Sequence, residues 1–374
     1  MPCIPLELVI HILENAYHNL DGSPDLKTLG SCALVCKAWA PIAQRISFHH
    51  AHVDRKKLLT PGNEERTRLS AAIGCLIKRP VLGAYVRVLE VSLGRDRHFT
   101  TLPRRLISLP DFITLLSFCP QLYQLMLSLE HRKFEAPTLS ALSKTALRLQ
   151  ALDIGTTSDP YRDLSFVLYQ LMEIWPSIRF LRLRSGLSVP PPPTRPPFAL
   201  YELHLVSPIV PTALKWLLPC PALTGSSLRV LDLGAAFTHL QPEELATFAA
   251  HAPFVYSLRV TREPVTGFVG LFTNIQEVVL CQLLLFPRLP AFPRSVRHLG
   301  LYSHPVSYAS DLDAQLGAAA DSLKNLPVLE SVTINSTIAK ICACRQLILG
   351  CRGRGVRLVV DPRERHDKPV STFL

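Results

Sequence analysis

A six-residue pattern recurs ten times along this chain of 374 residues and constrains its fold more than any other feature. Each copy holds an aliphatic residue, two variable positions, a second aliphatic residue, one variable position and a third aliphatic residue. The first copy spans residues 86–91 and the tenth spans residues 329–334. Because the last two aliphatic residues of a copy are two positions apart, both side chains fall on one face of a strand.

The spacing of the copies predicts a stack of strands joined by return segments. The middle aliphatic residues are Leu89, Leu125, Leu152, Leu181, Leu203, Leu231, Leu258, Val278, Leu299 and Val332. Successive copies are 20 to 36 residues apart, which leaves room for a short helix or a loop between strands. One strand with one return segment cannot bury its own apolar face, whereas stacked neighbours form a continuous core. We also predict an eleventh strand over residues 356–360.

Prolines mark where several return segments end. Pro120, Pro176, Pro253 and Pro327 each lie two residues before the first aliphatic residue of a copy. Proline cannot continue a preceding helix and favours extended geometry in the residue before it. Helical runs precede these prolines at residues 111–118, 164–175, 243–251 and 311–325.

The ten copies resemble leucine-rich repeats of the irregular, longer type, over residues 86–361. The resemblance implies an α/β fold: a solenoid of parallel strands with helical or loop return segments. That family usually places Asn or Cys three residues after the last strand leucine. Here those positions hold Glu130, Thr157, Gly186, Pro208, Ala236, Glu263 and His304. We therefore expect no asparagine ladder in the turns.

The first fifty residues lack the strand pattern and predict three short helices. Leu6, Val9, Ile10 and Leu13 recur at helical spacing. Further helical runs cover residues 26–35 and 39–46. A unit of this size buries little apolar surface, so we expect it to gain stability from a partner or from the neighbouring domain.

The same fifty residues resemble an F-box. Residues 4–13 read IPLELVIHIL, and residues 33–39 read ALVCKAW, which match the order of that motif. The resemblance implies that this unit binds the Skp adaptor and, through it, the cullin and RING subunits of a Skp–cullin–F-box ubiquitin ligase. The residues carried over as adaptor-binding are Pro5, Leu6, Leu8, Val9, Ile12, Leu13, Leu34, Val35, Cys36 and Trp39. Trp39 is the candidate anchor, because Trp is enriched at binding hot spots, and a core role fits it equally well.

F-box proteins often join this module to a repeat domain that selects a client protein. The resemblance therefore implies a non-catalytic substrate receptor, and the client is not identifiable from the sequence. Client contacts are expected at the outward strand positions, which are Glu90, Met126, Asp153, Arg182, His204, Asp232, Arg259 and Thr333. The domains follow as an F-box-like unit at 1–50, a linker with a first atypical repeat at 51–85, the solenoid at 86–361 and a flexible tail at 362–374.

No constellation of catalytic or metal-binding residues stands out, so we expect neither an enzyme nor a bound metal or cofactor. Cys32 and Cys36 lie four residues apart, but no further ligands follow at zinc spacing. Among His49, His50 and His52, the strand period separates the first from the other two. The sequence holds no glycine-rich phosphate loop and no nucleophile elbow.

Charge and hydropathy limit the expected partners and the expected cellular compartment. The formal net charge is +11, but the basic residues are scattered, so we do not expect nucleic-acid binding. No apolar stretch is long enough to span a membrane and the N-terminus is unlike a signal peptide, so we expect a cytoplasmic or nuclear protein with reduced cysteines.

Three alternatives remain open at this point. The first is a leucine-rich-repeat scaffold whose N-terminal helices only cap the solenoid; such a cap should have a polar outer face. The second is an F-box protein, or a diverged copy, that works outside ubiquitination. The third is an anion or nucleic-acid binder, which requires Arg182, Arg184 and Arg259 to converge on one face.

Overall fold

The computed structural model divides the chain into two compact units. One contains residues 1–185 and 192–198, and the other contains residues 186–191 and 199–374. The residues that the structure describes are 5–16, 25–35, 37–53, 79–94, 107–130, 133–156, 163–221, 225–286, 288–303, 309–340 and 344–361. Most of the predicted linker, Cys36 and the predicted tail lie outside these ranges.

The first unit begins with three helices that share a small core. They are α1 (Leu6–Ala16), α2 (Leu26–Val35) and α3 (Trp39–His49). Their buried residues are Val9, Leu13, Leu29, Ala43 and Ile46, with Cys32, Ala33, Trp39 and Ile42 packed against them. Asp25 caps α2, because its carboxylate accepts hydrogen bonds from the Thr28 backbone N–H at 2.9 Å and the Thr28 hydroxyl at 2.6 Å.

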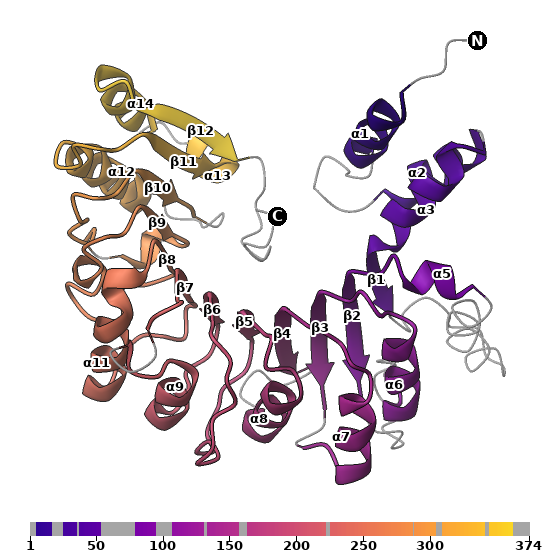
Figure 1. Ribbon diagram of the computed structural model, residues 1–374. Coiled ribbons are helices and arrows are strands. Elements are labelled where there is room, and N and C mark those ends of the chain that lie inside the picture. The colour runs from indigo at the N-terminus through magenta and orange to yellow at the C-terminus, as the bar shows by residue number, and fades with distance from the viewer. Residues whose placement is uncertain are drawn as a thin grey trace. The chain divides into compact units, whose positions relative to one another are not determined.

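The strands of the first unit are parallel and follow one another in chain order. They are β1 (His50–Val53), β2 (Val88–Leu93), β3 (Gln124–Leu129), β4 (Ala151–Thr156) and β5 (Phe180–Leu183). The return segments carry α5 (Pro80–Gly83), α6 (Leu109–Ser117), α7 (Ala136–Ser143) and α8 (Ser165–Ile174). These helices lie on one side of the strands, as Figure 1 shows.

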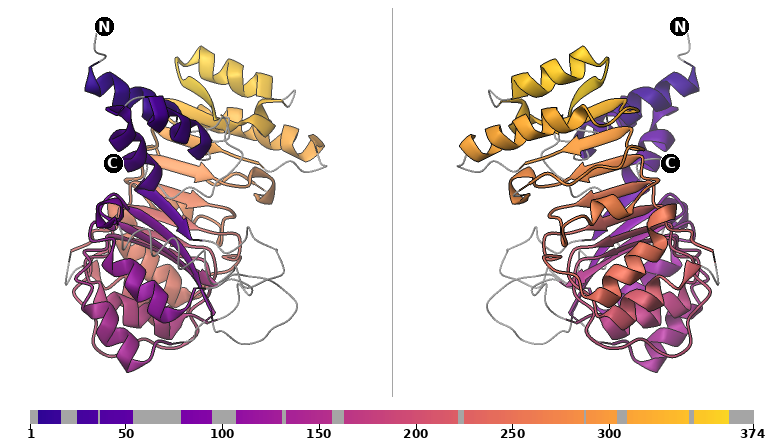
Figure 2. Two further views of the ribbon diagram at one scale, coloured as in Figure 1. Left: turned by 90° about the vertical axis from the view of Figure 1, so that its right-hand side faces the viewer. Right: turned by 90° about the vertical axis from the view of Figure 1, so that its left-hand side faces the viewer.

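The second unit repeats this arrangement with seven parallel strands. They are β6 (Glu202–Leu205), β7 (Val230–Leu233), β8 (Ser257–Val260), β9 (Glu277–Leu280), β10 (His298–Leu301), β11 (Ser331–Asn335) and β12 (Arg357–Asp361). Its helices are α9 (Pro211–Leu217), α11 (Pro242–His251), α12 (Ala309–Leu323), α13 (Ser336–Ala339) and α14 (Cys344–Gly353). Helices α9, α11, α12 and α14 lie on one side of the strands, and α13 directly follows β11 (Figures 1 and 2).

The shortest return segments of the second unit contain 3-10 turns in place of α-helices. They are η2 (Val269–Leu271) after β8 and η3 (Leu283–Leu285) after β9, and η1 (Ala252–Phe254) extends α11. These two segments join the copies that are 20 and 21 residues apart, where the chain is too short for a helix and two turns. The uneven spacing of the sequence pattern thus sets which repeats carry helices.

All eleven predicted strands are present, and each described strand pair is parallel, so the repeat-like α/β architecture is confirmed. The strands begin about two residues later than the first aliphatic residue of each copy. Leu122, for example, lies before β3 and donates its backbone N–H to the carbonyl of Cys119. The first aliphatic residue is therefore buried in the turn before the strand.

One strand escaped the sequence pattern. Residues 51–85 were expected to hold a linker and a first atypical repeat, and residues 50–53 form β1, which pairs with β2 through His50↔Val88 and Val53↔Val91. Its core-facing residues are in register with Leu89 and Val91 and are only Ala51 and Val53. The missing leucine is why the aliphatic pattern does not reveal this strand.

Buried serines occupy the turns where the asparagine ladder is missing. Ser185, Ser207 and Ser303 each lie two residues after the last leucine of a strand, and each is almost fully buried. The Ser185 hydroxyl accepts a hydrogen bond from the Thr156 backbone N–H at 3.1 Å. Asn335 is also buried, and its side-chain amide donates to the Ser303 carbonyl at 2.7 Å. These side chains satisfy backbone groups that the turns would leave unpaired.

Gly83 allows α5 to lie close to the backbone at the end of α6. A Cβ atom at this position would lie 2.0 Å from the carbonyl oxygen of Phe118, the residue that follows the end of α6. A Cβ atom at Gly30, in the middle of α2, would meet nothing within 4 Å.

Gly83→Ala should therefore destabilise the first unit by about 1–3 kcal/mol, because the backbone around Phe118 must move. Gly30→Ala is the matched control and should stabilise by up to about 1 kcal/mol, since alanine is the better helix former. Urea unfolding followed by circular dichroism measures both. Equal effects of the two substitutions would contradict the close approach at Gly83.

His251, the last residue of α11, contacts the segment between α9 and β7 through both of its ring nitrogens. Its Nδ1 lies 2.8 Å from the Ser226 hydroxyl, and its Nε2 lies 3.0 Å from the Pro219 carbonyl. Burial lowers the pKa of His251 below the ordinary value for histidine and outweighs the opposing effect of the bond to Pro219. The folded chain therefore favours the neutral ring, with Nε2–H donating and Nδ1 accepting.

The lowered pKa predicts a loss of stability in mild acid. The unfolded chain takes up a proton at His251 near pH 6.5, and the folded chain does so only at lower pH. The contribution of the neutral His251 ring to folding stability is therefore complete above about pH 6.5, and it is lost as the pH falls through the pKa that His251 has in the folded chain. Urea midpoints at several pH values should fall more steeply for wild type than for His251→Gln. Parallel curves would contradict this assignment.

Candidate protein-binding sites

Helix α1 carries two apolar stripes, and only one of them is buried. Val9 and Leu13 are four residues apart and lie in the core of the three helices. Leu8 and Ile12 are also four residues apart, but about 100° around the helix, and their side chains are 53% and 45% exposed. The unit therefore presents apolar surface that its own helices do not cover.

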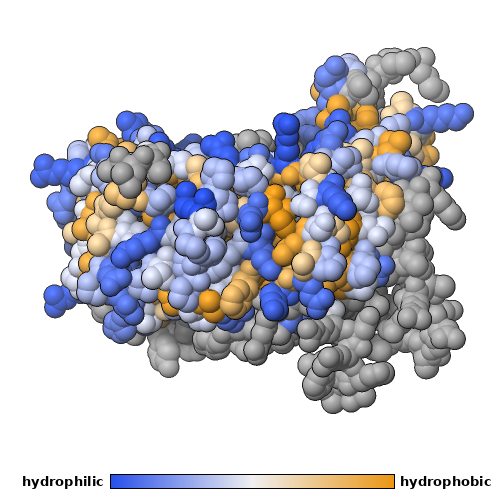
Figure 3. All heavy atoms as spheres, turned by 60° about the horizontal axis from the view of Figure 1, so that its bottom comes forward, coloured by the Kyte–Doolittle hydropathy of each residue, from blue (hydrophilic) through white to orange (hydrophobic). Residues whose placement is uncertain are grey.

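A second exposed apolar pair ends α2. Leu34 is 87% exposed and Val35 is 65% exposed, whereas Leu29 on the same helix is fully buried. Figure 3 shows hydrophobic residues at the surface over the N-terminal helices, at the upper right of the view. Exposed aliphatic side chains of this kind on a small unit favour contact with a partner.

The residues that the F-box resemblance carried over differ in their exposure to solvent. Pro5, Leu8, Ile12, Leu34 and Val35 are exposed, and Trp39 is half-buried against the core. Val9 and Leu13 are buried, so any part they take in binding is indirect, through the packing of α1. The Leu6 side chain and Cys36 lie outside the described part of the chain.

The outward strand positions form rows in register on the strand face that the helices do not cover. In the first unit, Glu90 is opposite Met126, Met126 is opposite Asp153 and Asp153 is opposite Arg182. In the second unit, His204 is opposite Asp232, and Asp232 is opposite Arg259. Thr333 continues the row on β11, opposite Gly300. The repeat thus aligns the predicted client-binding residues within each unit.

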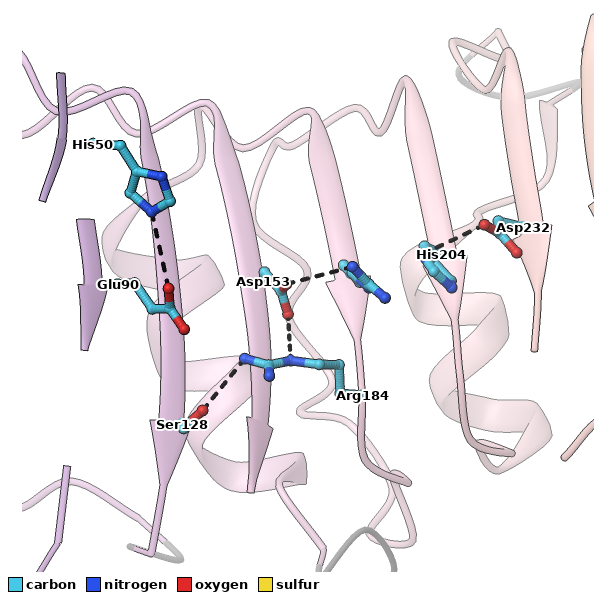
Figure 4. A network of polar contacts seen from close by, with 8 residues as sticks. His50, Glu90, Ser128, Asp153, Arg184, His204 and Asp232 are labelled. Atoms are coloured by element: carbon cyan, nitrogen blue, oxygen red, sulfur yellow. Dashed lines mark hydrogen bonds and ion pairs between the residues drawn. The ribbon is translucent and has the colours of Figure 1, made fainter. Parts of the chain in front are cut away.

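Asp153 is the centre of a charged network in the first unit. Its carboxylate accepts a hydrogen bond from Arg184 Nε at 2.7 Å and lies 3.9 Å from Arg182 Nη1. Arg184 also reaches the Ser128 hydroxyl at 3.4 Å, as Figure 4 shows. Burial raises the pKa of the Asp153 carboxyl, and the two guanidinium groups oppose that shift.

Gly155 makes room for the Arg184 side chain to cross β4. A Cβ atom on Gly155 would lie 2.8 Å from the Arg184 Cβ and 3.1 Å from its Nε. The side chain of Arg184 can therefore lie flat over this strand and reach back to Asp153. A larger residue at position 155 would push the guanidinium away from the carboxylate.

Two further polar pairs involve histidines and carboxylates. His204 Nδ1 lies 3.5 Å from Asp232 Oδ2 in the second unit, and both side chains are largely buried. His50 Nε2 lies 3.9 Å from Glu90 Oε2 in the first unit (Figure 4). Within the predicted rows, Asp153 thus pairs with Arg182 and His204 pairs with Asp232, whereas Glu90 pairs with His50 on β1.

Asp153 itself is a poor candidate for client contact, because its side chain is only 4% exposed. Its carboxylate instead pairs with Arg182 and Arg184, and client binding at this row of residues stays a prediction. Arg184 and Ser128 were missing from the predicted row. They lie two residues beyond Arg182 and Met126, so extending the strand period by one step would have found them.

In the described part of the chain, no three histidine, cysteine, aspartate or glutamate side chains come together as a metal site. No described helix has the length and apolar character needed to cross a membrane. Comparison with known proteins adds no relatives: no family model matches the chain, and no curated protein is significantly similar to it.

The network around Asp153 predicts unequal effects of two charge-removing substitutions. Asp153→Asn leaves two arginines without their shared carboxylate and should destabilise the first unit by about 1–3 kcal/mol. Glu90→Gln removes a partly exposed carboxylate that lies 3.9 Å from His50, and it should cost less than about 1 kcal/mol. Chemical denaturation compares the two variants. An equal cost would show that Asp153 is no more than a surface charge.

Proposed function

We propose that this chain is the substrate-receptor subunit of a Skp–cullin–F-box ubiquitin ligase, with leucine-rich repeats following an F-box. Helices α1 to α3 bind the Skp adaptor, and the uncovered strand face binds a client protein. The chain has no catalytic role. It raises the effective concentration of client lysines near the ubiquitin-charged enzyme, so its contribution to the reaction is positioning.

The observation that carries the proposal is the exposed apolar stripe of α1. Leu8 and Ile12 are at positions where the F-box resemblance expects adaptor contacts, and the helix buries its other stripe, Val9 and Leu13, internally. Leu34 and Val35 add exposed apolar surface in the second part of the motif. A helical partner that covers these side chains gains the free energy of removing them from water.

The same stripe argues against a unit that only caps the repeats. An end cap should turn a polar face outward, whereas α1 turns Leu8 and Ile12 outward. The anion-binding alternative is weakened in the first unit, because Arg182 and Arg184 both converge on the Asp153 carboxylate. The Asp153 carboxylate compensates part of their charge.

The proposal predicts which exposed residues the adaptor needs. In a titration of the full chain with purified Skp adaptor, Leu8→Asp with Ile12→Asp should weaken binding at least tenfold, because each buried aliphatic side chain contributes about 1.5–3 kcal/mol. Leu34→Asp alone should also weaken adaptor binding.

Val81→Asp is the matched control, since Val81 is 63% exposed on α5 of the same unit and lies outside the motif. It should bind the adaptor as wild type does. Circular dichroism verifies that each variant is folded. Loss of binding with Val81→Asp, or wild-type affinity of the Leu8 and Ile12 variant, would refute the proposed adaptor site.

A further inference from the structure

Among the described residues, the sheet of the second unit ends at β12 with an unpaired edge. β12 pairs with β11, and no further strand adjoins it among the described residues. Arg357 donates its backbone N–H to the carbonyl of Glu330, which precedes β11. Because backbone groups alternate in direction along a strand, the N–H and C=O groups of Leu358 and Val360 point away from β11.

Apolar side chains remain exposed next to this edge. Val360 is 49% exposed, whereas Ile334, its partner in register on β11, is fully buried. On α14, Cys344, Leu347 and Cys351 are buried, but Leu349 is 59% exposed. Terminal repeats ordinarily present a polar outer face, whereas this end of the repeat also exposes Val360 and Leu349.

The same end of the unit is strongly basic. Residues 340–361 contain five cations, Lys340, Arg345, Arg352, Arg354 and Arg357, against the single anion Asp361. Arg345, Leu349 and Arg352 are spaced at i, i+4 and i+7, so they share one exposed face of α14. Arg345, Arg352 and Arg357 form no ion pair with any described residue. Asp361 accepts a hydrogen bond from the Tyr302 hydroxyl at 3.4 Å.

We propose that β12 and α14 form a docking site for an acidic, extended segment of another protein. The segment adds a parallel or antiparallel strand to β12 through the backbone groups of Leu358 and Val360, which no described strand pairs. Its alternate apolar side chains cover Val360 and Leu349 on the helix side of the sheet, and the carboxylates between them face Arg357 on the other side. Arg345 and Arg352, beside Leu349 on α14, attract the segment through its negative charge. This site is independent of adaptor binding by the N-terminal helices.

Two features favour a protein segment over a nucleic acid. An open strand edge offers alternating N–H and C=O groups, which match a peptide backbone and not a phosphate chain. The exposed Val360 and Leu349 offer an apolar contact at side-chain spacing. Charge alone would also attract nucleic acid, so the test includes a DNA probe.

The direct test uses the full chain and a fluorescent seven-residue peptide of alternating glutamate and valine. Fluorescence anisotropy should show saturable binding, which weakens as salt is added. A peptide of equal charge with proline in place of each valine should bind at least tenfold more weakly, because it cannot extend the sheet. A short DNA duplex should bind more weakly than the valine peptide.

Variants of the full chain test the strand edge and the arginine charges separately. Val360→Pro removes an edge N–H that no ladder bond uses and should weaken peptide binding at least tenfold, whereas Val360→Thr keeps that N–H and should bind within about threefold of wild type. Arg345→Glu with Arg352→Glu should also weaken binding at least tenfold. Hydrogen exchange on wild type should slow at Leu358 and Val360 when the peptide is added, which gives a readout that does not depend on the proline variant folding.

Each opposite result overturns the proposal. Equal binding of the proline peptide would reduce the site to a patch of positive charge, and tighter binding of the duplex would assign that patch to nucleic acid. An absence of peptide binding at low salt, or unchanged exchange at Leu358 and Val360, would show that the edge accepts no added strand.

Discussion

Burial of two aliphatic side chains on each strand is the interaction on which the rest of this structure depends. Leu125 and Leu127 of β3, for example, are fully buried, yet the return segment of their own repeat cannot enclose them alone. Each strand is covered only because its neighbours continue the layer. Parallel pairing in chain order follows, since every return segment brings the chain back to the same starting edge. The outward residues of successive strands are therefore held in register.

That constraint gives the two faces of the strands different roles. The faces of the strands that pack on the helices hold the fold, and the opposite faces and the ends of the array are free to carry polar networks and contacts. In the first unit the Asp153 carboxylate compensates part of the charge of Arg182 and Arg184. The N-terminal helices are too small to bury all their aliphatic side chains, and β12 lacks a further strand among the described residues. Both ends therefore expose surface that the repeat itself has no means to cover.

The sequence predicts the repeated strands well, because a period of two aliphatic residues has one structural solution. It fails at β1, where Ala51 and Val53 replace the larger aliphatic residues. It predicts which residues point outward but misses that Arg184 crosses β4 over Gly155 to reach Asp153, since that contact depends on three strands together. It also groups Leu8 with Val9, because both are apolar. Only the packing of α2 and α3 decides which of the two stays exposed.

Hydrogen–deuterium exchange of the full chain, with and without the Skp adaptor, tests the central claim most directly. The account predicts slower exchange confined to α1, the end of α2 and the start of α3, with the strands of both units unchanged. The helices already share a core, so added protection there reports coverage of their outer surface by the adaptor. Protection that appears on the strands, or is missing from α1 at saturating adaptor, would contradict a receptor that docks through its N-terminal helices.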